Sequence, residues 1–250
     1  MNNSYFLFFQ LCYKYNSMEM EDIEIQVWTE EQKKSRWEEL LDAWFNFCKY
    51  EPMNAAITHL LDEGPNKTSL GLVLRDMMQF DDTPLIVAWD KVNKRVAGWL
   101  YAVSEHVGKT EESDEALYSF SRYDFDPDTL HGLKTMIKFL VDLAKKADIL
   151  NKFGVDKLVA IQVTTVCPEY KKRGIANTMT AKFLEVAKGL GFSVVRAEST
   201  SAYTQHNKIK TFQFEKVLEV AYADGYATFS DMPEDIKDSH KTATILVKKI

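Results

Sequence analysis

Three cations and a glycine stand together in the segment CPEYKKRGIA, residues 167–176. The β-branched apolar run KLVAIQVTTV (157–166) predicts a strand before this segment, and the amphipathic run behind Gly174 predicts a helix. The first turn of a helix exposes unpaired N–H groups and a partial positive charge, so it can bind an anion. Gly174 would let an anion approach the backbone closely, and the cations before it add positive charge. The residues alone are consistent with a pyrophosphate site or with an ordinary exposed turn whose cations are solvated.

The elements around this loop predict a mixed α/β fold. Strands are expected at 22–28, as a hairpin over 83–106, and at 158–166, 192–200, 215–223 and 242–250. Helices are expected at 30–50 with Thr29 as its cap, and at 53–62, 68–80, 128–149, 174–188 and 203–213. The polar, acidic stretch 108–128 is expected to be a loop with some helix. Because a helix crosses between the strands 158–166 and 192–200, these two strands should be parallel.

Composition narrows the class of protein. The chain has 250 residues, 46% hydrophobic and 27% charged, which suits one globular domain. A net charge of −6 argues against a nucleic-acid-binding protein. The three cysteines, Cys12, Cys48 and Cys167, show no metal-ligand spacing, so no metal and a reducing, cytoplasmic setting are expected.

The N-terminal residues 1–20 are expected to be a disordered or loosely docked extension. Their apolar run YFLFFQLCY (5–13) is too short to span a bilayer and lacks the basic flank of a signal peptide. No membrane contact is therefore expected. Residues 21–250 are expected to form a single domain that is a monomer or a weak dimer.

The segment PEYKKRGIA resembles motif A of the GCN5-related N-acetyltransferases, an acyl-CoA loop that reads roughly Arg/Gln-x-x-Gly-x-Gly/Ala. Lys171 departs from that pattern, and the loop is completed by Lys172, Arg173, Gly174, Ile175 and Ala176. Four further segments resemble the insect-type arylalkylamine N-acetyltransferases, in the same order along residues 21–250. They are KYEPMNAAI (49–57), STSAYTQ (199–205), AYADGYATF (221–229) and HKTATILVKKI (240–250).

The resemblance implies a mixed central sheet flanked by helices, with a splayed central strand followed by a pyrophosphate loop. The co-substrate would be acetyl-CoA. Backbone groups of Thr164, Thr165 and Val166 would pair with its pantetheine arm and align the thioester, and an N–H near Val166 would stabilise the oxyanion. Residues 171–176 would hold the pyrophosphate.

The resemblance also supplies catalytic candidates. A primary alkylamine titrates near ~10, like lysine, so a base must remove its proton. Glu51 matches the family's proposed base, and Thr200 and Thr204 match two serines that the family places near it. The alternatives are a solvated carboxylate at a helix end for Glu51 and a helix cap for Thr200.

Some positions depart from the family or compete with these candidates. The segment KIKTFQF (208–214) lacks the Gly-Phe pair that many members carry, and Ile209 falls near their general-acid tyrosine; the insect-type enzymes lack that tyrosine too. This leaves the geometry of 205–214 open.

Two other residues compete with these candidates. Tyr203 could act as the acid. Cys167 could carry an acyl group, although the simpler interpretation is that Cys167 is a small buried residue. His240 matches a family position for which the sequence suggests no role.

The sequence thus favours transfer of an acetyl group to a small primary amine, in particular an arylalkylamine. A polyamine, diamine or amino-acid acceptor is a second hypothesis, to which the acidic run EESDE (111–115) would be suited. The third is an acyl-CoA-binding protein without catalysis. No nucleic-acid partner is expected.

Overall fold

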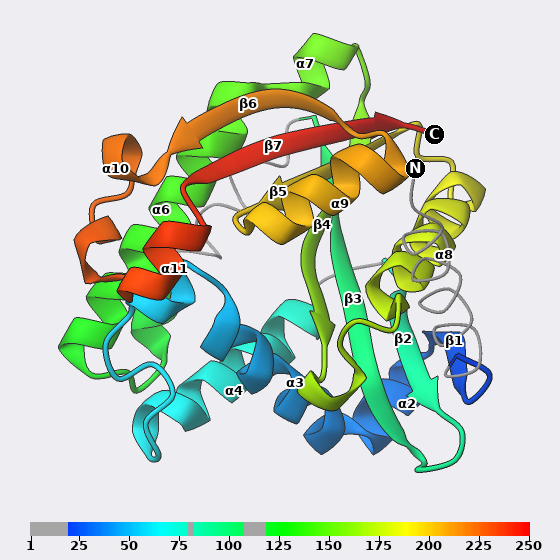
Figure 1. Ribbon diagram of the computed structural model, residues 1–250, viewed down its shortest axis with the longest axis horizontal. Coiled ribbons are helices and arrows are strands. Elements are labelled where there is room, and N and C mark those ends of the chain that lie inside the picture. Colours follow the sequence, from blue (N-terminus) through cyan, green and yellow to red (C-terminus); the bar gives the residue numbers. More distant parts are fainter. Residues whose placement is uncertain (1–19, 80–82, 108–118) are drawn as a thin grey trace, which may run out of the picture.

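A computed structural model describes residues 20–79, 83–107 and 119–250 (Figure 1). Within them, one sheet has the strand order β1-β2-β3-β4-β5-β7-β6. Its strands are β1 (Ile23–Trp28), β2 (Leu85–Asp90), β3 (Arg95–His106), β4 (Lys157–Val166), β5 (Val194–Ser199), β6 (Glu215–Ala221) and β7 (Thr242–Lys249). β4 and β5 are parallel, and all other neighbours pair antiparallel. The predicted α/β fold and its parallel unit are confirmed.

Helices flank this sheet. They are α2 (Glu30–Ser35), α3 (Trp37–Tyr50), α4 (Pro65–Gln79), α6 (Pro127–Ala147), α7 (Ile149–Phe153), α8 (Ile175–Gly189), α9 (Ala202–Phe212), α10 (Tyr222–Gly225) and α11 (Glu234–Ser239). Short 3₁₀ turns cover Asn54–Ala56, Ser119–Arg122, Pro168–Tyr170 and Phe229–Asp231. The predicted cap is present: the Thr29 hydroxyl accepts from the Gln32 N–H, and the Gln32 side chain accepts from the Thr29 N–H. No described helix is both long and apolar enough to cross a membrane.

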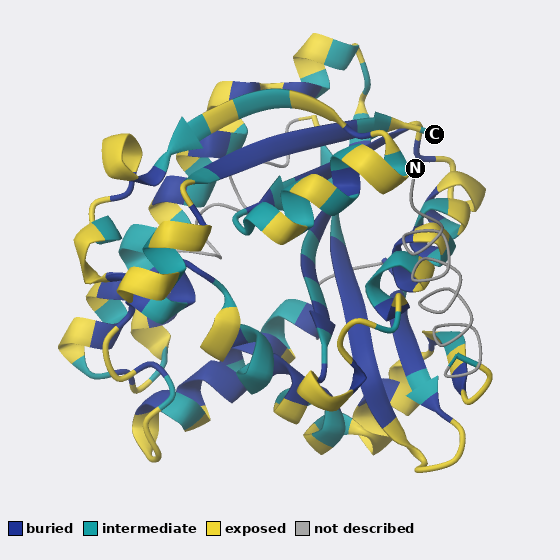
Figure 2. Cartoon of the chain, viewed as in Figure 1, coloured by how far each residue is buried: buried dark blue, intermediate teal, exposed yellow. Residues whose placement is uncertain are grey.

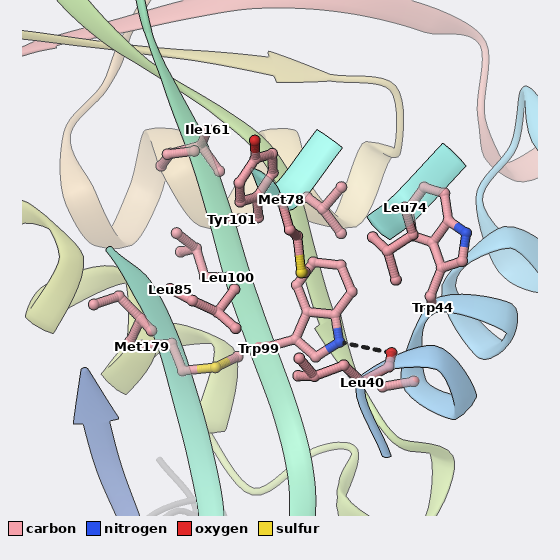
Figure 3. Close-up of a cluster of buried hydrophobic side chains, with 14 of the residues drawn as sticks. Leu40, Trp44, Leu74, Met78, Leu85, Trp99, Leu100, Tyr101, Ile161 and Met179 are labelled. Carbon is pink, nitrogen blue, oxygen red and sulfur yellow. Dashed lines mark hydrogen bonds between the residues drawn. The ribbon is translucent and has the colours of Figure 1, made fainter. Parts of the chain in front are cut away.

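The core lies on both sides of the central strands, which are buried along most of their length (Figure 2). α3 and α8 both pack against β3. Trp99 of β3 is fully buried, and its indole N–H donates to the Leu40 carbonyl of α3 at 3.2 Å (Figure 3). A second cluster of buried residues lies under α6 and includes Phe139, Tyr222 and Tyr226.

Several predicted boundaries are wrong. The helix expected at 30–50 is two helices, because Arg36 leaves helical geometry with φ −122°. The helix expected at 53–62 is only a 3₁₀ turn over Asn54–Ala56, since a Glu51 carboxylate oxygen takes the Asn54 N–H and His59 has φ 60°. α4 begins at Pro65, where proline suits a first helical position, rather than at 68.

The strand expected at 215–223 also ends early. β6 stops at Ala221, and α10 occupies the segment whose resemblance suggested a strand. The expectation for residues 1–20 falls, apart from Met20, outside the described residues, as does the acidic run 111–115.

Candidate active site

β4 and β5 separate halfway along their length. They pair only where residues 159–161 lie opposite residues 195–197, although β4 runs on to Val166 and β5 to Ser199. A register shift against β3 sets Tyr101 opposite Val163 and Ala102 opposite Ile161, so Gln162 is an extra, bulged residue. Beyond the bulge, β4 pairs with β3 and not with β5. The splayed central strand is therefore confirmed, and one edge of residues 162–166 is open for an added partner.

The three residues predicted to line this edge differ in their surroundings. Thr165 is buried, and its hydroxyl donates to the Ala43 carbonyl of α3 at 3.2 Å. Its side chain therefore holds β4 on α3, and its carbonyl oxygen lies against Gly98 of β3, so neither group faces the open edge. Thr164 and Val166 are half-buried. Gly98 of β3 lies so close that an added Cβ would stand 2.4 Å from the Thr165 carbonyl oxygen.

The cationic loop ends at an uncapped helix. Gly174 is the N-cap residue of α8 with φ 81°, and no side chain caps this end. Lys172 also has a positive φ, 65°. The first N–H groups of α8 have no acceptor within the helix, so the loop offers backbone donors to an anion. The residues present fit a pyrophosphate here.

The loop is anchored on its strand side by Tyr170. This buried phenol donates to Asp90 at 2.6 Å and accepts from the Arg95 guanidinium at 2.7 Å, and Arg95 also pairs with Glu169 at 3.0 Å. Although burial acts to raise it, hydrogen bonds from Tyr170 and Asn93 hold the pKa of Asp90 well below its usual range. The network ties the loop to the β2–β3 hairpin.

The cations of the loop pack on aromatic rings. The Lys171 ammonium lies 4.1 Å from the centre of the Tyr50 ring, and the Arg173 guanidinium lies 5.2 Å from the Tyr170 ring. Tyr50 directly precedes Glu51. The loop predicted to bind acetyl-CoA thus contacts the residue that precedes the predicted base in the chain.

Glu51 is the C-cap residue of α3, and its carboxylate is held in an unusual state. Oε2 accepts from the Asn54 N–H at 2.7 Å. Oε1 is buried and forms no hydrogen bond with the residues that the structure describes. Burial raises the pKa of the Glu51 carboxyl, while the Thr200 hydroxyl and the N–H groups of Asn54 and Met53 act to lower it. A buried carboxylate with one free oxygen is suited to accept a proton.

The two threonines predicted beside Glu51 differ. Thr200 comes just after β5, and its hydroxyl acts to lower the pKa of the Glu51 carboxyl. Thr204 lies in α9, half-buried, and no hydrogen bond among the described residues joins it to Glu51. The capping alternative for Thr200 does not hold, because Ser201 is the N-cap of α9 and the Ala202 N–H donates to His240 Nδ1 at 3.1 Å.

Two tyrosines next to Glu51 were not among the predicted site residues. The Tyr222 hydroxyl donates to the Thr200 carbonyl at 2.6 Å, and the Tyr226 hydroxyl donates to the Met53 carbonyl at 3.3 Å. Both rings contact Phe139, with ring centres 6.1 and 5.4 Å apart. In the sequence they were marked only by the segment AYADGYATF (221–229), which resembles the insect-type arylalkylamine N-acetyltransferases. That resemblance suggested no role for either tyrosine.

The competing candidates are placed less well for chemistry. Burial, and next the charge of Glu169, raise the pKa of the Cys167 thiol to about 11, so the thiolate needed for an acyl-cysteine is disfavoured. Tyr203 is 75% exposed, with its ring edge-on to His240. A cavity of about 420 Å³ opens between α3 and Cys167, and its lining includes neither Glu51 nor Thr200.

The segment that departs from the family folds regularly. α9 runs to Phe212, and Gln213 takes the left-handed conformation with φ 57° at the position where the family's glycine would stand. Lys208 of α9 is buried, and its ammonium donates to the Thr180 hydroxyl of α8 at 2.9 Å. The segment without the Gly-Phe pair thus forms a regular helix that ends in a left-handed residue.

Comparison with known proteins extends the description of the fold. No protein-family model and no curated protein matches the sequence. The crystal structure of arylalkylamine N-acetyltransferase 2 from Aedes aegypti superimposes with a TM-score of 0.73 at 21% identity, over 92% of this chain and 99% of that one. Polyamine N-acetyltransferase from Drosophila melanogaster gives 0.66 at 16% identity, over 92% of this chain and 100% of that one.

An agmatine N-acetyltransferase gives a TM-score of 0.67 at 15% identity, over 92% of this chain and 100% of that chain. At these identities the likeness establishes the fold. The chain has the fold of the GCN5-related N-acetyltransferases, and it resembles the insect arylalkylamine N-acetyltransferases through nearly its whole length, as the sequence motifs predicted.

Proposed function

We propose that the protein transfers the acetyl group of acetyl-CoA to the primary amine of a small molecule, with Glu51 as the general base. The observation that carries this proposal is the buried Glu51 carboxylate, whose Oε1 is free of hydrogen bonds from the described residues. A buried, unsatisfied carboxylate oxygen is unfavourable for folding, so its presence at the splay of β4 and β5 favours a role with a ligand.

In this proposal each part of the chain has a separate task. The uncapped end of α8 binds the pyrophosphate, and the open edge of residues 162–166 pairs with the pantetheine arm and orients the thioester. Acetyl-CoA supplies an activated acyl group. Glu51 Oε1 takes the proton of the attacking amine directly or through one water, and the Thr200 hydroxyl orients the carboxylate.

The acceptor we favour is an arylalkylamine. The rings of Phe139, Tyr222, Tyr226 and Phe229 form a continuous aromatic cluster beside Glu51, with centre-to-centre distances of 5.4 to 6.1 Å between neighbours. Offset and edge-on contacts between rings stabilise such clusters, and an aromatic acceptor could extend this one. The Aedes aegypti enzyme of the same fold is named for this class of acceptor.

A diamine acceptor is the second candidate, and a cluster of charges favours it. Arg196 of β5 is buried between two carboxylates and donates to Glu105 and Glu198, each at 2.7 Å. Burial raises the pKa of Glu198, while the charge of Arg196 acts to lower it. With both carboxylates ionised, the cluster carries one negative charge in excess. Glu198 is two residues before Thr200, so strand alternation puts both side chains on one face, where a second ammonium group could pair with it.

The experiment is a measurement of CoA release from acetyl-CoA with aromatic ethylamines, polyamines and amino acids. Glu51→Gln should lower kcat by about 10²- to 10⁴-fold, the usual contribution of a general base, and should leave acetyl-CoA binding unchanged. Glu38→Gln, on the exposed face of the same helix, is the matched control and should retain activity.

The outcomes separate the hypotheses. Turnover with aromatic ethylamines supports the favoured acceptor, and turnover with polyamines alone moves the assignment to the second. Binding of acetyl-CoA without turnover by any amine would identify a non-catalytic acyl-CoA-binding protein. Failure to bind acetyl-CoA would refute the proposed function altogether.

A further inference from the structure

Two tyrosine side chains of α10 reach two distant parts of the candidate site. One part is the turn after α3, which carries Glu51 and Met53; the other is the end of β5, which carries Thr200. We propose, on the basis of the proposed function, that Tyr222 and Tyr226 are positioning residues that hold these two parts together through hydrogen bonds to their backbones. Neither tyrosine reacts with the substrate.

The two bonds reach two different segments near the Glu51 carboxylate. Tyr222 Oη donates to the Thr200 carbonyl at 2.6 Å, and Tyr226 Oη donates to the Met53 carbonyl at 3.3 Å. Met53 follows Glu51 by two residues, and its N–H is one of the groups that stabilise the carboxylate. Residues from 51 to 53 and residue 200 have no short connection along the chain, so the tyrosines supply a link between them.

The phenols cannot easily move to other partners. Tyr222 is fully buried and Tyr226 is 3% exposed, and their ring centres lie 6.0 Å apart. The short helix is fitted closely to its neighbours: a Cβ added at Gly225 would stand 2.9 Å from a methyl of Val220 and 3.2 Å from the Phe139 ring. The rings therefore fix where each hydroxyl points.

Their chemistry favours holding a position over donating a proton in the reaction. Burial, and next the charge of Glu51, raise the pKa of Tyr222 far above its usual range. Burial is also the main reason that the pKa of Tyr226 rises to about 12. Both hydroxyls remain protonated and already donate to carbonyls. Because misplacing a catalytic group by about 1 Å can lower a rate by roughly 10²-fold, a link of this kind can control the rate without taking part in the chemistry.

The test replaces each hydroxyl separately. Tyr222→Phe and Tyr226→Phe should each lower kcat about tenfold or more and leave the KM for acetyl-CoA unchanged. In Tyr222→Phe the Thr200 hydroxyl is no longer held at Glu51, so the acidic limb of the pH profile of kcat/KM for the amine should move to higher pH. Tyr101→Phe is the matched control, because this buried tyrosine donates to the Met77 carbonyl at 2.5 Å.

A double-mutant cycle identifies the route. If Tyr222 acts through Thr200, Tyr222→Phe should have little further effect on kcat in a Thr200→Val background. Additive losses, or a pH profile that moves no further than in Tyr101→Phe, would overturn the inference. If Tyr222→Phe does not fold, Tyr226→Phe tests the same idea through Met53.

A readout that is independent of turnover separates this inference from the proposed function. The Glu51 carboxyl can be titrated by carbon-detected NMR in the wild type and in Tyr222→Phe, with Glu51→Gln to assign the signal. A higher pKa in the variant supports the link even if no amine is acetylated. An unchanged pKa overturns it even if the wild type is an active enzyme.

Discussion

The buried lysine of α9 should make the protein less stable at neutral pH than at alkaline pH. Lys208 is 4% exposed, and its ammonium has one hydrogen bond, to Thr180, with the rings of Phe212 and Phe214 5.8 and 5.7 Å away. No carboxylate among the described residues lies within 4.0 Å to pair with it. Burial lowers its pKa from 10.5 to about 7.

The magnitude follows from that difference. Each unit of pKa difference between the folded and unfolded states corresponds to about 1.4 kcal/mol. Between pH 10.5 and about 7 the unfolded chain binds a proton that the folded chain does not, so the free energy of unfolding decreases as the pH falls. At pH 7 the loss should be on the order of 4 kcal/mol relative to a neutral side chain.

The assay is urea unfolding of the wild type and Lys208→Met between pH 7 and pH 9.5. Methionine keeps the apolar stem and removes the charge, so the variant should be more stable at pH 7. Its advantage should shrink by roughly 3 kcal/mol at pH 9.5, where the unfolded wild type begins to lose the proton. Lys210→Met, an exposed lysine of the same helix, should show no such pH dependence. An advantage that is constant with pH, or a less stable Lys208→Met, would refute the reasoning.

Three further predictions follow from single residues. Because burial raises the pKa of Glu51 above 4.5, its ionisation opposes folding as the pH rises, so Glu51→Gln should raise the Tm at pH 7 and lose this advantage near pH 4. Gly98→Ala should destabilise the fold by about 3 kcal/mol in urea unfolding, since the new Cβ meets the Thr165 carbonyl, whereas Gly189→Ala, with open space around it, should not. Gln213→Gly should raise the free energy of unfolding by about 1 kcal/mol by relieving a positive φ, and a loss of stability would show that the glutamine side chain matters there.

The sequence was most informative where structure is local. The βα loop at Gly174 could be predicted from the run of residues itself, because a strand pattern, a glycine and a helix pattern follow one another without interruption. The cap at Thr29 likewise depends on residues three apart. Resemblance to a family then pointed to Glu51 and Thr200, which the fold brings together.

Other features depend on contacts that no local pattern records. The helix expected at 53–62 has suitable residues, yet the Glu51 carboxylate takes the Asn54 N–H and His59 turns the chain out of helical geometry. The role of His240 as acceptor for the first N–H of α9 joins residues 38 apart in the chain. The bond from Tyr226 to Met53 spans 173 residues and could only be found in the folded molecule.

The strand order has a consequence for how the protein is made. β1 to β4 pair in chain order, so this part of the sheet can assemble as each strand is synthesised. Among the described strands, β6 pairs only with β7, and the end of β5 beyond residue 197 also pairs only with β7. Neither can be completed until residues 242–249 have been made. Pairing between strands far apart in sequence is slow, because the intervening chain must first be closed into a loop. The end of β5, which precedes Thr200, and α10, which carries Tyr222 and Tyr226, thus reach their places late, so the surroundings of the proposed base Glu51 are complete only when the sheet is.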